Sequence, residues 1–456
     1  MYFPRLIDDY LNHWMSSDDH KPLLLRGARQ VGKSSCIRHL GERFDYYIEA
    51  NFENHPELKV LFEKERDVHV LAGQLGMMFN VPVVPGRTLI FLDEIQVSQA
   101  AIKSLWFFRE NYPELHVVAA GSLLEFTLKE LSSYGVGRIR SIHIYPMSFN
   151  EFLMAQGKTQ WVTAKQQADS QHPLLGILHN ELVQQFRMFM IVGGMPASVA
   201  KWVTTHNFSQ CQDEMDDIIS SYYDDFAKYA PQLKPELLRN TLQSVIMQQG
   251  GKFVYSRVEG AFRIDDVKLA LSMLVHAGLI KRVSHTAANG LPLGAEVNDK
   301  FRKYIYIDSG LMLRLMDLDL GGGRDLTQTI LAGAAADLVN KGGLTESILG
   351  WEMIKYSSPR LQHDLYYWEN TTNGTRSEVD YVIARDLKVL PIECKAGTSG
   401  KMKSLWLFMK NKHLTLAYRC SLENFSSLQK TDSASGVTRT ILINPLYAVA
   451  NIMQQP

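Results

Sequence analysis

The sequence predicts an α/β protein whose first third forms a parallel sheet with helices packed around it. Over residues 1–150, short apolar runs typical of buried strands alternate with helical patterns. Residues 151–230 read as helices, and a second group of strands follows in residues 325–456. At 456 residues with 46% hydrophobic side chains, the chain can form about two to four packed domains.

The composition limits the kinds of partner that the chain can have. Lys and Arg together number 48, as do Asp and Glu, so a nucleic-acid surface would have to be a local patch. The four cysteines are scattered with no C-x-x-C pair, which predicts reduced thiols and a cytoplasmic location; they are Cys36, Cys211, Cys394 and Cys420. No signal-peptide pattern opens the chain, and no apolar run approaches the roughly 20 residues that span a bilayer. We therefore expect no membrane partner.

The first motif follows the first predicted strand. A short amphipathic helix is expected at 5–15, then a buried strand at Leu23–Leu25. The next residues, 27–34, read GARQVGKS and match G-x-x-x-x-G-K-[ST] at every fixed position. A helix is expected to follow. A strand, a glycine-containing loop and a helix in this order form a P-loop, although a glycine turn could match by chance.

The P-loop predicts a site for ATP and Mg²⁺. Its backbone N–H groups and the helix N-terminus would surround a phosphate group. Lys33 would reach the β- and γ-phosphates, and the Ser34 hydroxyl would ligate Mg²⁺. The expected nucleotide-binding residues are Gly27, Ala28, Arg29, Gln30, Val31, Gly32, Lys33, Ser34 and Ser35.

A second acidic motif lies about 60 residues further on. A strand is expected at 46–50, a charged helix at 57–64 and a buried strand at 88–92, which leads directly into Asp93 and Glu94. This is a Walker B element. Asp93 would hold Mg²⁺, and Glu94 would polarise the water that attacks the γ-phosphate.

A polar residue follows the next strand. A helix is expected at 100–109 and a strand at 116–120, which ends in Gly121 and Ser122. Ser122 could contact the γ-phosphate or its water as a sensor, or it could cap a helix. A further strand is expected at 141–145.

These motifs resemble those of AAA+ ATPases, in the bacterial and archaeal group whose second half is a domain of unknown function. The resemblance lies in GARQVGKS, in LDEIQ at 92–96, in AAGSLL at 119–124 and in GRIRSIHIYPMSFNEFL at 137–153. It implies an oligomer in which Arg138 is an arginine finger for a neighbouring subunit's nucleotide. A surface arginine paired with a carboxylate is the alternative.

The helical region at 151–230 is expected to form the lid of the ATPase. By the same resemblance, Pro196 in the Gly193–Pro196 element would lie against the adenine ring. A helix that ends in two glycines, followed by a proline, is an equally good physical interpretation.

Residues 231–324 are expected to form a winged-helix-like domain. Helices are expected at 237–248, 254–262 and 266–277, followed by a strand hairpin over 279–308. Such a domain binds DNA or protein. Asp265 and Asp266 would repel phosphates at the start of the third helix, so a structural or protein-contact role is favoured.

The last block, 325–456, contains a PD-(D/E)xK nuclease pattern. Asp380 lies in one expected strand, and Glu393 and Lys395 lie in the next, after a helix at 344–356 that carries Glu346 and Glu352. Strand residues at i and i+2 share a face, so Glu393 and Lys395 would point together. Asp380 and Glu393 would hold Mg²⁺, Glu346 would complete its shell, and Lys395 would orient the attacking water.

A basic stretch adjoins this pattern. Five lysines and no acid lie between 395 and 412, with Trp406 and Phe408 among them, which suits a phosphate backbone or simply a solvated helix face. The sequence thus favours an oligomeric AAA+ ATPase with a nuclease-like domain that acts on or near DNA. The alternative is a nucleotide-dependent switch or scaffold that binds a protein partner, with an inactive nuclease-like domain.

Overall fold

The computed structural model describes residues 2–121, 124, 127–128, 137–229, 233–319, 341–372, 375–397, 402–433 and 435–453. The chain divides into two compact units. Unit 1 comprises Met1–Met147, His276–Gly278 and Ser358–Gln362, and unit 2 comprises Ser148–Val275, Leu279–Ser357 and His363–Pro456. Whether each of the four expected domains folds as a unit of its own stays a prediction.

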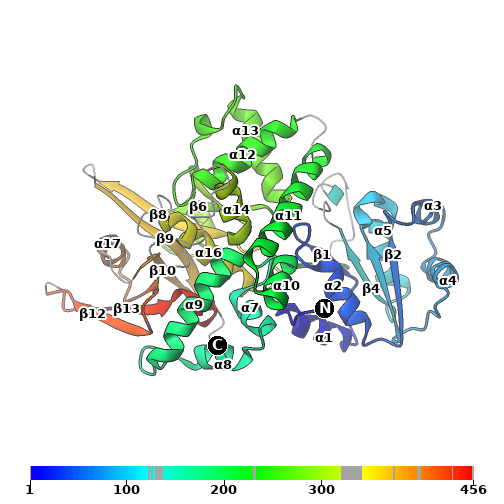
Figure 1. Ribbon diagram of the computed structural model, residues 1–456, viewed down its shortest axis with the longest axis horizontal. Helices are drawn as coiled ribbons and strands as arrows, with labels where there is room; N and C mark the ends of the chain where they lie inside the picture. The colour runs from blue at the N-terminus through cyan, green and yellow to red at the C-terminus, as the bar shows by residue number, and fades with distance from the viewer. Residues whose placement is uncertain are drawn as a thin grey trace. The chain divides into compact units, whose positions relative to one another are not determined.

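Unit 1 is a parallel five-stranded sheet with helices packed on it (Figure 1). Its elements are α1 (Ile7–Met15), β1 (Leu23–Arg26), α2 (Lys33–Gly41), β2 (Tyr46–Asn51), α3 (Glu57–Lys64), α4 (Val68–Phe79), β3 (Thr88–Asp93), η1 (Ile95–Val97), α5 (Gln99–Asn111), β4 (His116–Ala120) and β5 (Arg140–His143). The strand order is β2-β3-β4-β1-β5, so β4 lies between the P-loop strand β1 and the acidic strand β3.

Apolar strands explain this core. Every residue of β3 and β4 is buried, as is typical of a parallel sheet covered on both faces. The side chains of α3, α4 and α5 complete one core cluster with these strands. The parallel sheet predicted from the sequence is confirmed, and the predicted P-loop and acidic motif lie at the carboxyl ends of β1 and β3.

Unit 2 begins with helices. They are α7 (Phe149–Ala155), α8 (Thr159–Gln167), α9 (Gly176–Val192), α10 (Pro196–Thr205), α11 (Phe208–Tyr229), α12 (Pro235–Met247), η2 (Tyr255–Arg257), α13 (Ile264–His276), α14 (Ser309–Asp319) and α16 (Lys341–Lys355). Ser148 caps α7, and the Glu151 carboxylate accepts a hydrogen bond from the Ser148 N–H at 2.6 Å. The Ser-Phe-Asn-Glu motif of the sequence is therefore a capping box.

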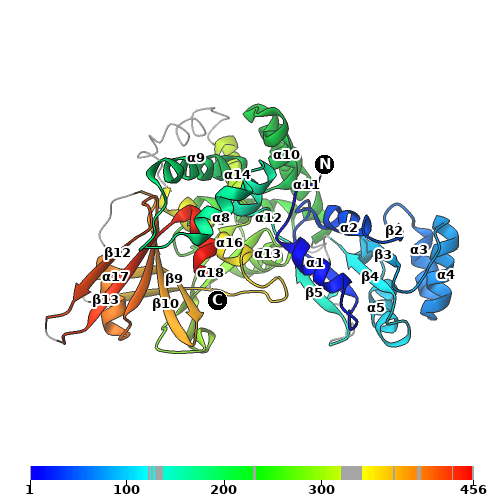
Figure 2. The ribbon, with the colours of Figure 1, turned by 90° about the horizontal axis from the view of Figure 1, so that it is seen from below.

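A single eight-stranded sheet runs through the rest of unit 2 (Figure 2). The remaining elements are β6 (Ile280–Thr286), η3 (Leu293–Glu296), β7 (Val297–Tyr306), β8 (Leu365–Thr372), β9 (Thr375–Arg385), β10 (Lys388–Cys394), α17 (Lys403–Asn411), β11 (Leu416–Ser421), β12 (Ser426–Thr431), β13 (Thr438–Pro445), η5 (Leu446–Ala448) and α18 (Val449–Met453). The strand order is β12-β13-β11-β10-β9-β8-β6-β7. Helix α16 packs on β7 and β10, and α17 packs on β9, β10 and β11.

The structure differs from the expected winged-helix-like arrangement in two respects. The middle helix expected at 254–262 is only the short turn η2, and the hairpin β6–β7 joins the sheet of the C-terminal block because β6 pairs with β8. A two-stranded hairpin has exposed edges that favour pairing with a further strand, but the sequence alone does not show which strand pairs with β6. This pairing brings β7 close to the acidic residues of β9.

Two further findings concern the cysteines and the apolar character of the helices. All four cysteines are free and buried. Within the described residues, no helix combines the length and the apolar character that crossing a bilayer requires.

Candidate nucleotide site and acidic cluster

The P-loop backbone has a conformation that depends on glycine. Gly27 has φ 140° and Gly32, the residue before α2, has φ 96°. A Cβ atom on Gly27 would lie 2.1 Å from the carbonyl oxygen of Ile144 on the chain after β5, so no other residue fits there. The loop leads straight into the N-terminus of α2, where free N–H groups and the helix dipole favour an anion.

Lys33 lies in the interior of this loop. Its ammonium donates hydrogen bonds to the carbonyl oxygens of Gly27 at 2.9 Å and Ala28 at 2.7 Å. Burial lowers the pKa of Lys33 to about 8, although the carboxylates of Glu94 and Asp93 oppose this effect. A polyphosphate would offer this ammonium a more strongly charged acceptor than two peptide carbonyls.

Asp93, the last residue of β3, lies beside the first turn of α2. The Ser34 hydroxyl donates a hydrogen bond to its Oδ2 at 2.9 Å, and the side-chain amide of Asn51 donates to the same oxygen at 3.4 Å. Burial raises the pKa of Asp93, and the neighbouring Glu94 carboxylate adds to this effect. A hydroxyl and a carboxylate in contact are the oxygen ligands that Mg²⁺ prefers, so these two residues fit the ion.

Glu94 has an unusual backbone conformation for a residue that is not glycine. Its φ is 52°, in the left-handed region, which costs of order 1–3 kcal/mol and is concentrated at functional sites. The Gln96 amide donates a hydrogen bond to the Glu94 carboxylate at 2.7 Å. A Cβ on Gly121 would lie 2.1 Å from the Gln96 side-chain oxygen, so Gly121 leaves room for this amide.

The roles in hydrolysis expected of two further residues stay predictions. Ser122 lies outside the described residues. Arg138 forms an ion pair with Glu110 of α5, and its guanidinium lies 5.6 Å from the centre of the Trp106 ring. This contact corresponds to the alternative interpretation of Arg138 as a surface residue paired with a carboxylate, and the role as an arginine finger stays a prediction.

Pro196 begins helix α10, and Met195 separates it from the glycine pair. The Gly194 N–H donates a hydrogen bond to the buried Asp308 carboxylate at 2.7 Å, and a Cβ on Gly193 would lie 2.2 Å from the same group. This geometry matches a helix end with two glycines followed by a proline at the next helix start. Contact of Pro196 with adenine stays a prediction.

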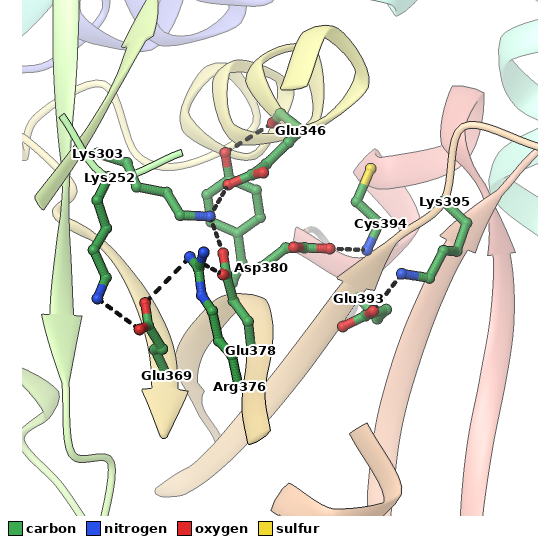
Figure 3. A network of polar contacts seen from close by, with 11 residues as sticks. Lys252, Lys303, Glu346, Glu369, Arg376, Glu378, Asp380, Glu393, Cys394 and Lys395 are labelled. Atoms are coloured by element: carbon green, nitrogen blue, oxygen red, sulfur yellow. Dashed lines mark hydrogen bonds and ion pairs between the residues drawn. The ribbon is translucent and has the colours of Figure 1, made fainter. Parts of the chain in front are cut away.

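The second candidate site lies in unit 2, where α16, β7, β9 and β10 meet (Figure 3). Glu393 and Lys395 form an ion pair at the end of β10, as their strand spacing predicts. Asp380 of β9 accepts a hydrogen bond from the Cys394 N–H at 2.7 Å. Glu346 of α16 comes close to Asp380, since carboxylate oxygens of Glu346, Glu378 and Asp380 lie within 4.8 Å of one another.

A lysine lies among these carboxylates. The Lys303 ammonium, from β7, donates a hydrogen bond to Glu346 at 2.8 Å and forms an ion pair with Glu378. Burial alone would lower the pKa of Lys303, but the carboxylates of Glu346 and Glu378 outweigh burial and raise it. Lys303 is therefore a fixed positive charge inside the acidic cluster.

The electrostatics of the carboxylates follow from burial. Burial raises the pKa of Glu346 to about 8, although the Lys303 ammonium opposes this effect. Burial also raises the pKa of Glu393 to about 7, and the Asp380 carboxylate adds to this effect. The Glu393 Oε2 atom is buried and has no hydrogen-bond partner among the described residues. An unpaired buried oxygen beside Asp380 fits a divalent cation, whereas Glu346, the expected third ligand, is already bound to Lys303.

Glu352, the other acid on α16, has a structural role. Its carboxylate accepts a hydrogen bond from the Phe149 N–H at 3.0 Å and pairs with Lys355. It thus caps helix α7 instead of joining the acidic cluster.

Sequence reasoning missed Gln96, Lys303 and Glu378. For Gln96 a signal existed, since it lies two residues after the Walker B acid. No sequence signal identified Lys303, because it is the last residue of the mostly charged segment Asp299–Lys303, which is typical of an exposed strand.

Three family models match parts of this chain. A family model described as an AAA domain matches residues 19–153. Two further models, described as domains of unknown function DUF8612 and DUF4143, match residues 183–321 and 341–436. Among curated proteins, no sequence matches this chain.

Two solved structures show a distant likeness. The Walker-type ATPase of Pyrococcus abyssi is 14% identical, with 69% of this chain and 96% of that chain covered at a TM-score of 0.44. The Aeropyrum pernix Orc1 protein, solved in complex with DNA, is 13% identical, with 69% and 91% covered at a TM-score of 0.28.

The AAA domain match coincides with the P-loop, the acidic strand end and the parallel sheet of unit 1. The chain therefore carries an AAA domain with a P-loop at residues 19–153 and a DUF4143 domain in its C-terminal part.

Proposed function

We propose that this protein binds ATP with Mg²⁺ and hydrolyses it at the P-loop of unit 1. Lys33 binds the β- and γ-phosphates, Ser34 and Asp93 hold Mg²⁺, and Glu94 takes a proton from the attacking water. The contact between the Ser34 hydroxyl and the Asp93 carboxylate at 2.9 Å is the observation that carries this proposal. It joins the two motifs, 59 residues apart, in one site.

Nucleotide binding tests the proposal directly. Lys33→Ala should lower ATP affinity about 10- to 100-fold, because charge-assisted hydrogen bonds to phosphate are worth about 1.5–3 kcal/mol. Lys59→Ala, which removes an exposed lysine of α3, is the matched control and should bind ATP as the wild type does. Equal affinity of the two variants in a titration with a fluorescent ATP analogue would refute the assignment of Lys33.

We also propose that the protein forms an oligomer, in which Arg138 acts on the nucleotide of a neighbouring subunit. The exposed position of Arg138 supports this proposal, since its side chain is 48% exposed and its partner Glu110 is 44% exposed. A surface ion pair of this kind is worth about 1 kcal/mol or less, so it can exchange for a stronger anionic partner.

For the C-terminal part, we propose a nuclease-like domain that acts on or near DNA. Asp380 and Glu393 would hold a divalent cation, which would activate water, and Lys395 would orient that water. A groove of about 470 Å³ between α17 and the β12–β13 hairpin supports contact with a phosphate backbone. Its lining includes Trp406 and the cationic side chains of Lys403, Lys410, Lys430 and Arg439, and the Asp432 carboxylate in the same lining pairs with Lys410 and Arg439.

One observation favours the alternative, a nucleotide-dependent switch that binds a protein partner and has an inactive nuclease-like domain. Lys303 binds Glu346, which removes the expected third carboxylate from a metal shell. The two proposals differ in one measurable activity, metal-dependent strand cleavage.

Nicking of supercoiled plasmid in Mg²⁺ or Mn²⁺ separates the two. If the domain cleaves DNA, Asp380→Ala and Lys395→Ala should each abolish nicking while ATP hydrolysis persists. Glu94→Gln is the reciprocal control and should still nick. Absence of nicking by the wild type with either metal would support the switch, and nicking that survives both tail variants would exclude this site as its source.

A further inference from the structure

The position of Lys303 has a consequence for cation binding that does not depend on whether the domain cleaves DNA. Lys303 is 1% exposed and reaches two elements that are distant in sequence, α16 through Glu346 and β9 through Glu378 (Figure 3). Its ammonium also lies 4.9 Å from the centre of the Tyr367 ring on β8. The ammonium is therefore enclosed by carboxylates and an aromatic face.

The carboxylates around it have the spacing of a cation site. Oxygens of Glu346, Glu378 and Asp380 lie within 4.8 Å of one another, close enough to be bridged by one ion with bonds of about 2.0–2.6 Å. The Lys303 ammonium is bonded to two of these three groups. A metal ion that used Glu346 and Glu378 would have to displace it.

The ion pairs of the cluster continue outwards through Glu378. Arg376 forms ion pairs with both Glu378 and Glu369, and Lys252 forms an ion pair with Glu369. Acidic and basic groups thus alternate from Lys252 at one end to Glu346 at the other (Figure 3). Three cations face three carboxylates along this row, and Asp380 is the one carboxylate of the cluster that lies outside it.

We propose that the Lys303 ammonium is the resident cation of the Glu346–Glu378–Asp380 cluster and that it excludes a divalent metal ion from this position. A divalent ion in the wild-type domain is then limited to Asp380 and Glu393, on the side of Lys395. Displacing a buried ammonium would leave its charge without a partner, so Mg²⁺ does not replace it.

Calorimetric titration of the nucleotide-free full-length protein with Mn²⁺ tests this inference. Lys303→Met removes the ammonium but keeps the length of the side chain, and it should bind Mn²⁺ at least about tenfold more tightly than the wild type or at one additional site. The P-loop is the same in both proteins, so its own binding cancels in the comparison. The double variant Lys303→Met with Glu378→Gln should not show this increase in Mn²⁺ binding.

Two controls fix the assignment. Lys252→Met removes another ammonium of the same row, distant from Asp380 in the chain of ion pairs, and should leave Mn²⁺ binding unchanged. Glu346→Gln in the presence of Lys303 should also leave it unchanged, because Glu346 is not a metal ligand in the wild type. A tenfold loss in Glu346→Gln, or equal Mn²⁺ binding by Lys303→Met and the wild type, would overturn the proposal.

Lys303→Met leaves three close carboxylates without their cation, so its folding must be followed. If the variant unfolds at a lower temperature, Mn²⁺ should restore its Tm, while the Glu378→Gln double variant should show no such response. A destabilised Lys303→Met protein whose Tm does not respond to Mn²⁺ would equally contradict the proposal.

Discussion

At the scale of single residues, Glu94 depends on Gln96 for its orientation. The Gln96 amide donates to the Glu94 carboxylate at 2.7 Å, and Gly121 leaves the space that this amide occupies. A base that removes a proton from water works best when its carboxylate is held in one direction. Gln96 is therefore a positioning residue for the proposed hydrolysis.

Gln96→Ala should lower the kcat for ATP hydrolysis about tenfold with little change in ATP affinity. A hydrogen bond to a charged group is worth about 1.5 kcal/mol, which corresponds to this factor. Steady-state kinetics and a binding titration on the same protein check it. A change in affinity with unchanged kcat would contradict a positioning role, and Gln99→Ala, at the start of α5, serves as a control.

Spacing within the sequence was sufficient to predict the residues that lie in one motif. Lys33 and Ser34 follow from the P-loop pattern, and Glu393 and Lys395 from strand alternation, since each pair is fixed by local geometry. Lys303 depends on the pairing of β6 with β8, which brings together segments about 80 residues apart. No local pattern encodes such a pairing.

At the scale of elements, helix α8 carries a lysine, Lys165, inside the protein. Lys165 is fully buried, and its ammonium has no hydrogen-bond partner among the described residues; it lies 5.9 Å from the centre of the Phe149 ring. Burial lowers the pKa of Lys165 to about 7, although Glu352 opposes this effect. The helix therefore forms at the cost of a desolvated charge.

Lys165→Met should stabilise the protein by about 1–4 kcal/mol near pH 6.5, as replacement of a buried charged group by a packed apolar one commonly does. The folded-state pKa of about 7 lies below the unfolded value of about 10.4, so folding releases a proton between these values. Wild-type stability thus rises with pH across this window.

The advantage of Lys165→Met should consequently shrink as the pH rises from 6.5 to 9. Urea unfolding of both proteins at the two pH values measures it. A difference that stays constant with pH, or a destabilised variant, would show that the Lys165 ammonium has a partner in solution.

The elements themselves were largely predictable, and their assembly was less so. β4 spans the expected residues 116–120, and α3 spans 57–64, because strong apolar patterns with clear ends define them. The expected helix at 254–262 is only η2, since its glycine and its exposed polar residues provide no apolar face to pack. The position of the β6–β7 hairpin depended on long-range pairing.

At the scale of the whole molecule, the proposed oligomer can be tested through Arg138. A guanidinium supplied to the γ-phosphate in trans is worth about a thousandfold in turnover. Arg138→Ala should therefore bind ATP and fold normally but hydrolyse slowly. Mixing it with Lys33→Ala subunits should restore part of the activity, because an intact P-loop then meets an intact arginine.

Glu110→Ala separates this role from a structural one. It breaks the same surface ion pair but leaves the guanidinium, so it should retain turnover. Equal turnover of Arg138→Ala and the wild type, or full activity of a monomer at every protein concentration, would rule out action in trans.

The central claim is that the P-loop of unit 1 hydrolyses ATP with Glu94 as the base. ATP turnover and ATP binding should be measured together for the wild type, for Glu94→Gln and for Glu53→Gln, which alters an exposed carboxylate of the same unit. We expect Glu94→Gln to bind ATP within about twofold of the wild type and to hydrolyse it at least about 100-fold more slowly, while Glu53→Gln matches the wild type. Hydrolysis by Glu94→Gln at the wild-type rate would contradict the account.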